Sequence, residues 1–431
     1  MGLTGIALGL LPLLAYSLKW SGNLSSNPRR PAWEHGGYKS PESLIVYGGI
    51  FVANYLSPYR RITRTGHGTR GRWRRSMEPV SGPLPAEAGA SGCGLWLCPV
   101  EVYTNVKSLA DNGTAANTHA NGMPSNLSIE LGMPHLGRNN LGESALFKVI
   151  GHDRWKQIQD IGGTPSAKIR DDAGARLYAT FYFLELHLSP QAPLSVHGEN
   201  DRLTFQTDLT HYAKVYLDGR HVMVGDPERW IRSSNVFIYQ ERGPSKLSLS
   251  VPTTIDFTSI PELSETPDSL DLCRQARSKG AFFEPAPDDV ALFDGRKEFV
   301  YKIDIDRDLN GAGLVYFANF LAFLDLAERE ILSTLPDPVP PEILDLRSPY
   351  QRRTGYYGNA QATDRLHIFL AARVRMLRGV NGCRLLDLGM DYQMRRSSDD
   401  KEILISSCRK VAPLEPGSDA ERWADRQRSR Q

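Results

Sequence analysis

The pattern of apolar and polar residues changes at about residue 126, where regular spacings begin. Leu146, Phe147 and Ile150 recur at near-helical spacing, which predicts an amphipathic helix. The run LYATFYFLELHL, residues 177–188, is dense in aromatic and aliphatic side chains, as in a buried strand. In order, the pattern predicts a strand, a helix and four strands at residues 126–131, 141–161, 177–188, 202–216, 237–241 and 247–251, with a hairpin turn at Asp218-Gly219.

The same order recurs in the C-terminal half. Residues 313–335 are apolar enough to predict a long buried helix, and Asp364-Arg365-Leu366 repeats the Asp201-Arg202-Leu203 that opens a strand in the first half. A strand at 299–305 precedes this helix, and strands at 366–377, 383–394 and 402–410 follow it. We interpret the pattern as an α+β architecture made of a duplicated unit, in which one strand and one long helix precede a run of antiparallel strands.

Composition divides the chain into five segments. They are an irregular N-terminal extension at 1–120, a first domain at 121–255, a linker at 256–290, a second domain at 291–415 and a disordered tail at 416–431. The extension begins with an apolar run, 2–17, that is shorter than the roughly 20 residues needed to span a membrane. Several arginines follow between residues 60 and 75. The extension is therefore either a tether to a membrane or a solvated, disordered arm.

Charge and cysteine usage exclude several classes of function. The chain has 51 basic and 49 acidic residues, so it has no cationic excess for binding nucleic acid. Its five cysteines are Cys93, Cys98, Cys273, Cys383 and Cys408. Their odd number and wide spacing favour a reduced, cytoplasmic compartment, with or without membrane association. The sequence has no paired metal motif, phosphate loop or serine elbow, and no metal is expected.

Residues 306–330, DRDLNGAGLVYFANFLAFLDLAERE, carry the first candidate chemistry. A glycine-containing turn that leads into a helix brings backbone amides and the helix dipole toward a carbonyl oxygen. The segment resembles the acyl-thioesterase branch of the hot-dog superfamily, with Asn310 where many members carry a carboxylate. The resemblance makes Asp308 and Asn310 candidate catalytic groups and Gly313 a substrate-binding position. The alternative role of the Asp and Asn is to cap the helix.

A second resemblance covers about residues 126–412. The chain carries Gly132-Met133, Gly142-Glu143-Ser144, Gly151-x-x-x-Trp155, YATFYF at 178–183, NGAGLVYFAN at 310–319 and RRTGYYGNAQATD at 352–364. Together these resemble the bifunctional acyltransferase/decarboxylase family of the leinamycin pathway. The resemblance implies a double hot-dog fold, with two long central helices each wrapped by a curved antiparallel sheet. It also implies a tyrosine that accepts the acyl group, for which Tyr178 is the best match; the alternative is a core aromatic.

Two polar segments supply the remaining candidates. One is the loop before the first helix, and the other is the comparable segment of the second half, whose arginines suit phosphates or an acidic carrier surface. The substrate-binding candidates are His135, Arg138, Asn139, Asn140, Gly142, Tyr357 and Asn359, and the carrier or coenzyme A contacts are Arg352 and Arg353. Ordinary turn chemistry is the alternative for both segments.

The second resemblance implies an enzyme of secondary metabolism that moves an acyl group from coenzyme A to an acyl carrier protein or polyketide synthase, with decarboxylation of a malonyl-type group as a further step. Two alternatives stay open: a hot-dog thioesterase or dehydratase/cyclase, and a non-catalytic binding module. No permanently bound cofactor is expected, because the acyl-CoA or phosphopantetheine thioester is the substrate. A tunnel lined by Phe181, Phe183, Phe317 and Phe320 is expected to exclude water. The expected oligomeric state is a monomer, itself a pseudo-dimer, or a dimer of double hot-dogs.

Overall fold

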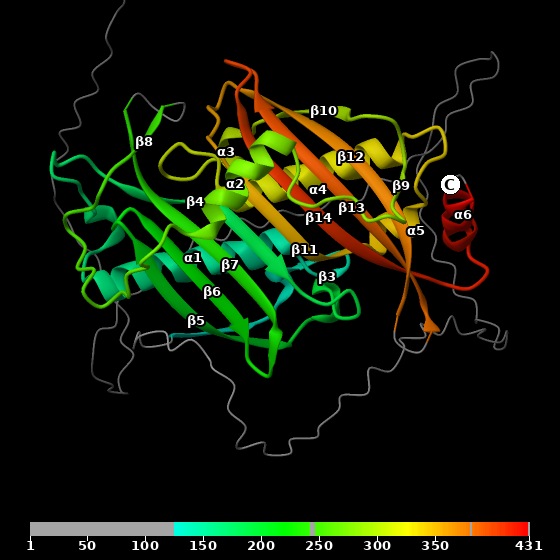
Figure 1. Ribbon diagram of the computed structural model, residues 1–431, viewed down its shortest axis with the longest axis horizontal. Helices are drawn as coiled ribbons and strands as arrows, with labels where there is room; N and C mark the ends of the chain where they lie inside the picture. Colours follow the sequence, from blue (N-terminus) through cyan, green and yellow to red (C-terminus); the bar gives the residue numbers. More distant parts are fainter. Residues whose placement is uncertain (1–124, 242–245, 380–381, 430–431) are drawn as a thin grey trace, which may run out of the picture. The chain divides into compact units, whose positions relative to one another are not determined.

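The computed structural model describes residues 125–241, 246–379 and 382–429 (Figure 1). These residues belong to one compact unit of the chain. The predicted N-terminal extension, with its apolar and basic runs and the expected membrane tether, lies outside the described residues. Within the described ranges, no helix is both long and apolar enough to cross a membrane.

The first half consists of a strand, a long helix and four further strands. These are β1 (Ser125–Glu130), α1 (Glu143–Gly162), β4 (Tyr178–His187), β5 (Arg202–Tyr212), β6 (Tyr216–Met223) and β7 (Asp226–Gln240). In the sheet the strands pair antiparallel in the order β1-β5-β6-β7-β4. Shorter elements are η1 (Met133–His135), β2 (Leu136–Gly137), β3 (Asn140–Leu141), η2 (Ser166–Lys168), η3 (Leu194–Val196) and β8 (Leu247–Leu249).

The second half repeats this plan. Its main elements are β10 (Lys297–Lys302), α4 (Phe317–Ser333), β11 (Ser348–Tyr356), β12 (Arg365–Arg378), β13 (Arg384–Arg396) and β14 (Glu402–Leu414). They pair in the order β10-β12-β13-β14-β11, which is the order of the first half. Four short helices and a short strand complete the described chain: α2 (Asp268–Lys279), β9 (Val290–Ala291), α3 (Ile305–Asp308), α5 (Pro341–Leu346) and α6 (Asp419–Arg428).

Antiparallel pairing of β4 with β11 joins the two halves into one sheet. In each half the first main strand along the chain lies at the outer edge of the sheet, and the second lies at the junction. The third, fourth and fifth strands lie between them in that order. Figure 1 shows α1 lying across the strands of the first half and α4 across those of the second. A helix against a large antiparallel sheet is the expected hot-dog arrangement, and the mirrored strand order reflects the predicted duplication.

The two central helices pack closely against each other. A Cβ atom added to Gly151 of α1 would lie 2.7 Å from the ring of Phe317 in α4, so glycine is needed for this approach. Nearer the helix starts, the hydroxyl of Ser144 donates to the carbonyl of Ala318 at 2.9 Å. Phe320 is 1% exposed and Leu321 is fully buried, so the first turns of α4 lie in the core.

The sheet divides at one end of the junction between the halves. β4 and β11 are paired from His187 and Gln351 as far as Phe183 and Gly355. Beyond that point the start of β4 continues to pair with β7, whereas the amide of Tyr357 donates to the carbonyl of Ile403 at 2.9 Å, on the β14 side. The two half-sheets therefore diverge, and side chains fill or line the gap between them.

Several predictions about local structure were wrong. Residues 348–356 form the central strand β11, where the sequence predicted a polar segment, with a turn as the alternative, and no strand. Arg352 and Arg353 of this strand are paired with acidic groups of other elements. Asp218-Gly219 lies inside β6, and the hairpin turn is at Ala213 and Lys214, which both have positive φ.

The expected linker and tail also contain ordered helices. α2 lies within residues 256–290 and contributes the buried side chain of Cys273. In the predicted disordered tail, α6 starts after Ser418, whose hydroxyl accepts the amide of Glu421 at 3.1 Å. Trp423 of this helix is 1% exposed, so burial of its indole stabilises a segment whose polar composition predicted disorder.

Candidate functional site

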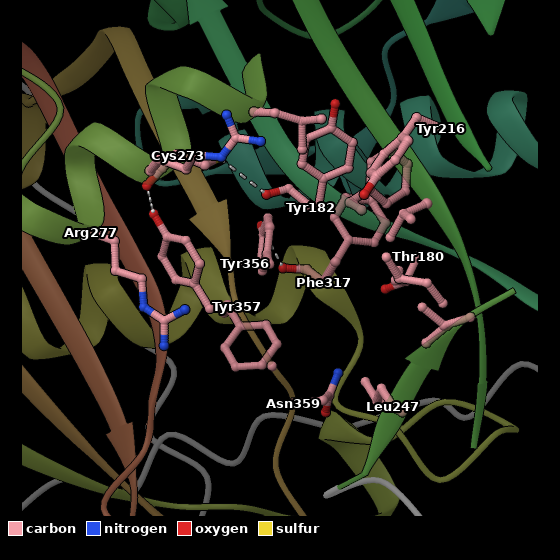
Figure 2. A pocket seen from close by; sticks show the side chains of 18 residues that line it. Thr180, Tyr182, Tyr216, Leu247, Cys273, Arg277, Phe317, Tyr356, Tyr357 and Asn359 are labelled. Carbon is pink, nitrogen blue, oxygen red and sulfur yellow. Dashed lines mark hydrogen bonds between the residues drawn. The ribbon is translucent and has the colours of Figure 1, made fainter. Parts of the chain in front are cut away.

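A cavity of about 400 Å³ lies where the two half-sheets diverge. Most of its lining is aromatic or aliphatic, and two arginines belong to it. The lining residues are Thr180, Phe181, Tyr182, Tyr216, Val236, Ile238, Leu247, Leu249, Leu270, Cys273, Arg274, Arg277, Phe317, Phe320, Tyr356, Tyr357, Gly358 and Asn359 (Figure 2). The cavity is thus bordered by β4, β7, β8, α2, the first turn of α4 and the end of β11.

Strand alternation places different parts of the lining on the two faces of the sheet. Phe181 belongs to the core under the central helices, and its ring centroid is 4.0 Å from that of Phe317. Tyr182 belongs to a separate cluster on the other face, and the register of β4 shifts between Phe181 and Phe183, so it lies at a bulge. Because the cavity is lined by groups from both faces, it leads from the outer face of the sheet toward the central helices.

On the outer face, α2 covers the cavity. The hydroxyls of Tyr182 and Ser269 are 2.7 Å apart, and the thiol of Cys273 donates to the carbonyl of Tyr182 at 3.8 Å. From β11, the hydroxyl of Tyr357 donates to the carbonyl of Cys273 at 2.8 Å (Figure 2). Tyr182 belongs to the first half of the fold and Tyr357 to the second, and both contact α2. Helix α2 therefore bridges the two half-sheets where they diverge.

Arg274 and Arg277 bring positive charge to the edge of the cavity. Both side chains are exposed, and they lie one helical turn apart on α2. The guanidinium of Arg277 lies 5.1 Å from the ring centroid of Tyr357, a cation–π contact, and Arg274 pairs with exposed Asp271 at 2.5 Å. An anionic group that enters between them would meet two cations beside an apolar cavity.

Burial holds one thiol and three phenols of the lining in their neutral forms. Burial raises the pKa of the Cys273 thiol to about 12, and burial also raises the pKa of the phenols of Tyr182, Tyr356 and Tyr357 well above the ordinary value. The hydroxyl of Tyr356 donates to the carbonyl of Phe317 at 3.1 Å. No carboxylate or imidazole lies in the described lining, so these groups position a ligand better than they would abstract a proton.

Two of the predicted site residues line the cavity. They are Tyr357 and Asn359, from the segment after Gly355. The amide side chain of Asn359 accepts from the amide of Val315 at 2.9 Å and donates to its carbonyl at 3.1 Å. Asn359 therefore fixes the chain just before α4, and Tyr357 is the predicted residue that is most directly placed to contact a ligand.

Tyr178 lies beside the cavity without lining it. It starts β4, is half-buried and packs against the outer-face cluster, with the guanidinium of Arg176 at 4.8 Å from its ring centroid. Of the four phenylalanines expected to line a tunnel, Phe181, Phe317 and Phe320 do so. Phe183 instead packs on the outer face against Phe282, because the bulge in β4 changes the alternation.

The turn before α4, which carries the predicted catalytic residues Asp308 and Asn310, does not line the cavity. Asp308 is 1% exposed and accepts from the Tyr301 hydroxyl at 2.7 Å and from Nε of Arg307 at 3.0 Å. Asn310 is exposed, and its side-chain oxygen accepts amides of its own turn from Ala312 at 2.9 Å and Leu314 at 3.2 Å. Gly313 has φ of 72° in this closed turn, three residues before the N-cap of α4.

The loop before α1 forms contacts between elements outside the cavity lining. Arg138 is mostly exposed and pairs with Asp345 at 2.8 Å, and Asn139 donates to the carbonyl of Leu346 at 2.6 Å. The remaining candidates also serve the backbone: Nδ1 of His135 accepts the amide of Gly132, Asn140 donates to the carbonyl of Ser195, and Gly142 is the N-cap of α1. The structure thus matches the turn-chemistry alternative for this loop.

The two arginines predicted as phosphate contacts, in β11, do not line the cavity either. Arg352 is 1% exposed, and its Nε donates to Glu143 at 2.6 Å under the central helices. Arg353 points to the other face, is half-buried and donates to Glu185 at 2.7 Å. The arginines at the cavity are instead Arg274 and Arg277, which sequence reasoning missed because their short helix lies in a segment dominated by Pro, Ser and acidic residues.

Comparisons with known proteins match this chain to solved structures only. No family model and no curated protein matches the sequence. Among solved structures, a Lactobacillus plantarum protein described as an oleoyl thioesterase has 11% identity and a TM-score of 0.45, over 69% of this chain and 99% of its own. An acyl-ACP thioesterase from Bacteroides thetaiotaomicron has 12% identity and a TM-score of 0.40, over 67% and 97%. A 12:0-ACP thioesterase from Umbellularia californica has 11% identity and a TM-score of 0.38, over 68% and 94%.

Proposed function

We propose that this protein processes an acyl thioester, with the acyl group in the cavity at the divergence of β4 and β11. The observation that carries this proposal is the combination of an aromatic-lined cavity of about 400 Å³ with two exposed arginines at its edge. A thioester on a phosphopantetheine arm matches this arrangement, because its anionic phosphate suits the arginines and its apolar acyl end suits the aromatic cavity. Coenzyme A and acyl carrier proteins both present such an arm.

In the proposed complex, the phosphate lies near Arg274 and Arg277 on α2. The arm then crosses the sheet between Tyr182 and Tyr357, and the thioester approaches the first turn of α4 at Phe317. The positive end of that helix would favour the negative charge that develops on the thioester oxygen. The aromatic walls exclude water, which favours transfer of the acyl group to another nucleophile over hydrolysis.

The proposed reaction is acyl transfer from coenzyme A to a carrier thiol. In the direct route, the carrier sulfur bonds to the acyl carbon, the bond to the coenzyme A sulfur breaks, and the proton of the carrier thiol ends on coenzyme A. In the route implied by the family resemblance, the oxygen of Tyr178 bonds to the acyl carbon, the bond to the coenzyme A sulfur breaks, and coenzyme A leaves with the phenol proton. The carrier sulfur then bonds to the acyl carbon, the ester bond to Tyr178 breaks, and the proton of the carrier thiol returns to the phenol oxygen. Loss of carbon dioxide from a malonyl-type group would be an additional step.

A non-catalytic binding module is the second candidate. The observation that favours it is the lack of a carboxylate or imidazole in the described lining, together with the raised pKa of the Cys273 thiol and of the phenols. The same observation weighs against hydrolysis and against dehydratase or cyclase chemistry, because those reactions need a positioned base.

Intact-mass spectrometry of the full chain tests these functions. The protein would be mixed with malonyl-, methylmalonyl- or acetyl-coenzyme A, with and without a phosphopantetheinylated carrier protein. Acyl mass that moves to the carrier supports transfer, and an enzyme adduct that is absent in Tyr178→Phe supports the tyrosine route. Free acid without acylated carrier indicates a thioesterase, and binding without turnover indicates the module.

The role of α2 has its own control. We expect Arg274→Ala and Arg277→Ala each to raise the KM for acyl-coenzyme A about threefold to tenfold, a typical range for losing one partly screened charge contact. Lys279→Ala removes an exposed cation from the same helix outside the lining, and should leave the KM unchanged. Equal effects of all three variants would indicate general electrostatic attraction and would remove the assignment of the phosphate to this edge.

A further inference from the structure

A groove of about 690 Å³ lies between α6 and one end of the second half-sheet. Aliphatic side chains of β9, β12, β13 and α6 line it, together with four arginines and two aspartates. The lining residues are Asp288, Val290, Val374, Arg375, Met376, Leu377, Arg378, Gly382, Arg384, Leu386, Ala424, Asp425 and Arg428. None of them belongs to the lining of the cavity between β4 and β11, so the groove is separate from the proposed acyl site.

The groove and the cavity lie at opposite ends of the same strands. Arg384 starts β13, whereas Met394, near the end of β13, pairs with Leu404 of β14. Leu404 also pairs with Tyr356, which lines the cavity. About ten residues of extended strand separate Arg384 from Met394, a distance of roughly 33 Å. A small ligand in one site therefore does not reach the other.

The end of β12 presents an unpaired strand edge to the groove. β9 pairs with β12 only as far as Val374, and the carbonyl of Ala372 accepts the amide of Leu292 at 2.9 Å on this edge. Backbone groups of alternate residues in a strand point to the same side, so the amide and carbonyl of Met376 also face this edge. Among the described residues, no strand pairs with the end of β12 on that side.

A tight turn ends the pairing of β9 with β12. Residues 286–289 form a β-turn, in which the amide of Asp289 donates to the carbonyl of Ala286 at 3.0 Å. Pro287 is the second residue of the turn, where its fixed φ is favourable. The carboxylate of Asp289 also accepts from Arg409 of β14 at 2.7 Å, which fixes the turn on the sheet. The chain before β9 therefore leaves the edge, and the last residues of β12 extend beyond it.

The same end of the sheet carries unpaired positive charge. Arg378 of β12 lies directly opposite Arg384 of β13, and like charges in this arrangement repel each other. Arg384 is neutralised by Glu421 and Asp425 of α6. Arg378 and Arg428 are exposed, and neither forms an ion pair with a residue that the structure describes. An anionic group in the groove would meet these two cations.

The strand edge and the charge together favour an extended acidic peptide as the occupant. An unpaired edge is completed by the backbone amides and carbonyls of another extended chain. In a strand added beside β12, the side chain opposite Arg378 lies on the same face as Arg378, so a carboxylate there would pair with it. The N-terminal extension of this chain has a basic run at 60–75 without a carboxylate, and its charge does not suit the groove.

We propose that the groove between α6 and β12 binds an extended, acidic peptide segment of a partner protein as an additional strand. The backbone of Met376 bonds to this strand, and a carboxylate opposite Arg378 pairs with that guanidinium and with Arg428. Aliphatic parts of the segment contact Val374 and Leu386. This interaction is independent of the acyl chemistry proposed above, because the two linings share no residue.

Fluorescence anisotropy with three labelled eight-residue peptides tests the proposal on the full chain. The first peptide alternates Glu with Thr, the second Lys with Thr, and the third Glu with Pro. The Glu–Thr peptide should bind, and the Lys–Thr peptide should bind at least about tenfold more weakly, because its charge is repelled. The Glu–Pro peptide keeps the negative charge but lacks half of the backbone N–H groups, and should also bind about tenfold more weakly.

Three results of this comparison would overturn the proposal. Equal binding of the Glu–Thr and Lys–Thr peptides would exclude recognition of acidic groups. Equal binding of the Glu–Thr and Glu–Pro peptides would exclude addition of a strand. Absence of binding by all three peptides at about 1 mM would exclude a peptide site of useful affinity.

Paired variants locate the binding site. Arg378→Ala with Arg428→Ala should weaken binding of the Glu–Thr peptide about twofold to thirtyfold, the range for losing two exposed ion pairs. Arg422→Ala with Arg426→Ala removes two exposed cations of α6 outside the groove lining, and should leave the affinity unchanged. Equal losses in the two double variants would indicate attraction by overall charge and would overturn the assignment. The affinity for acyl-coenzyme A should be unchanged in both, so failure of this proposal leaves the proposed function intact.

Amide hydrogen exchange measured by NMR covers the case in which a double variant does not fold. In the unmodified protein, the Glu–Thr peptide should slow exchange of the Met376 amide, whereas the Lys–Thr peptide should not. The Leu377 amide is the internal control, because strand alternation directs it to Leu385 of β13 and away from the edge. A bound peptide that leaves exchange at Met376 unchanged would lie elsewhere and would overturn the assignment. Dimerisation of the chain that is lost in Arg378→Ala would also overturn it, since a second copy would then occupy the groove.

Discussion

Arg352→Met tests whether a buried ion pair joins the two halves of the fold. Glu143 opens α1 in the first half, and Arg352 lies in β11 of the second half. Their side chains are 2% and 1% exposed, with 2.6 Å between Nε and Oε1. Nη1 of Arg352 also donates to the hydroxyl of Ser406 at 3.1 Å. Methionine keeps most of the volume of arginine and removes both hydrogen bonds and the charge.

The expected loss follows from burial. Removing one partner of a buried pair leaves the other charge uncompensated, at a cost of about 3–5 kcal/mol in the free energy of unfolding. Burial raises the pKa of Glu143 above its ordinary value, and Arg352 opposes that rise. Without Arg352 the folded-state pKa rises further. A carboxyl with a raised folded-state pKa contributes stability below its unfolded pKa of roughly 4.3 and loses that stability as pH rises through the folded value.

Urea denaturation at pH 5 and pH 8 measures both effects. We expect Arg352→Met to lose about 3–5 kcal/mol at pH 8 and less at pH 5, with an unchanged dependence on urea. The double variant Glu143→Gln with Arg352→Met should recover part of the loss, because the uncompensated carboxylate is gone. A loss below about 1 kcal/mol at both pH values, or a double variant no more stable than the single one, would refute the reasoning.

Three further predictions concern groups outside the proposed chemistry. Asp308→Asn should cost about 1.5–3 kcal/mol in urea denaturation at pH 7 and leave steady-state kinetics unchanged, because the side chain stabilises its turn outside the cavity. Burial raises the pKa of Asp308, but hydrogen bonds from Arg307, the Asp304 amide and Tyr301 lower it below the ordinary value. The carboxylate therefore stabilises the fold above its unfolded pKa, and this stabilisation is lost as pH falls through the folded pKa. The Asp308→Asn variant should not show this loss of stability in acid. Trp423→Ala should cost about 3–5 kcal/mol, measured by urea denaturation, since the indole is 1% exposed; a loss within 0.5 kcal/mol, the roughly neutral range of surface changes, would restore the disordered-tail prediction. Peptide mapping after iodoacetamide treatment at pH 8 should find exposed Cys383 labelled, and Cys273 unlabelled until urea unfolds the chain. The reason is that burial raises the pKa of the Cys273 thiol to about 12. Rapid labelling of Cys273 in the folded protein would contradict that burial.

Local pattern was sufficient for most of the secondary structure. The near-helical spacing at Leu146, Phe147 and Ile150 correctly predicted α1, and the apolar run at 313–335 correctly predicted α4. These signals are strong because one face of each helix is buried along its whole length. The sequence failed at β11, where buried Arg352 and half-buried Arg353 pair with carboxylates from distant segments. Their charge gave the appearance of an exposed turn.

The candidate site shows the same limit. Tyr357 and Asn359 were predicted and line the cavity, whereas Asp308 and Asn310 were predicted from their local motif and hold their own turn instead. A motif shows which residue types are adjacent, but it does not show which way a turn faces. Sequence reasoning also did not predict the burial of Arg154, which is 1% exposed, since a single arginine in an amphipathic helix ordinarily lies on the solvent side.

By itself, the sequence determined a duplicated α+β unit with two central helices, the first amphipathic and the second apolar, because the spacing of buried positions can be read from the order of residues. Tertiary structure alone decided where the halves diverge, since the register of β4 against β11 ends at Phe183 and Gly355 through contacts between segments about half the chain apart. It also decided that α2 covers the opening and that Gly219 makes room for the guanidinium of Arg154. Cavities and ion pairs depend on distances between strands and helices remote in sequence, and those distances are set only when the two half-sheets pack together.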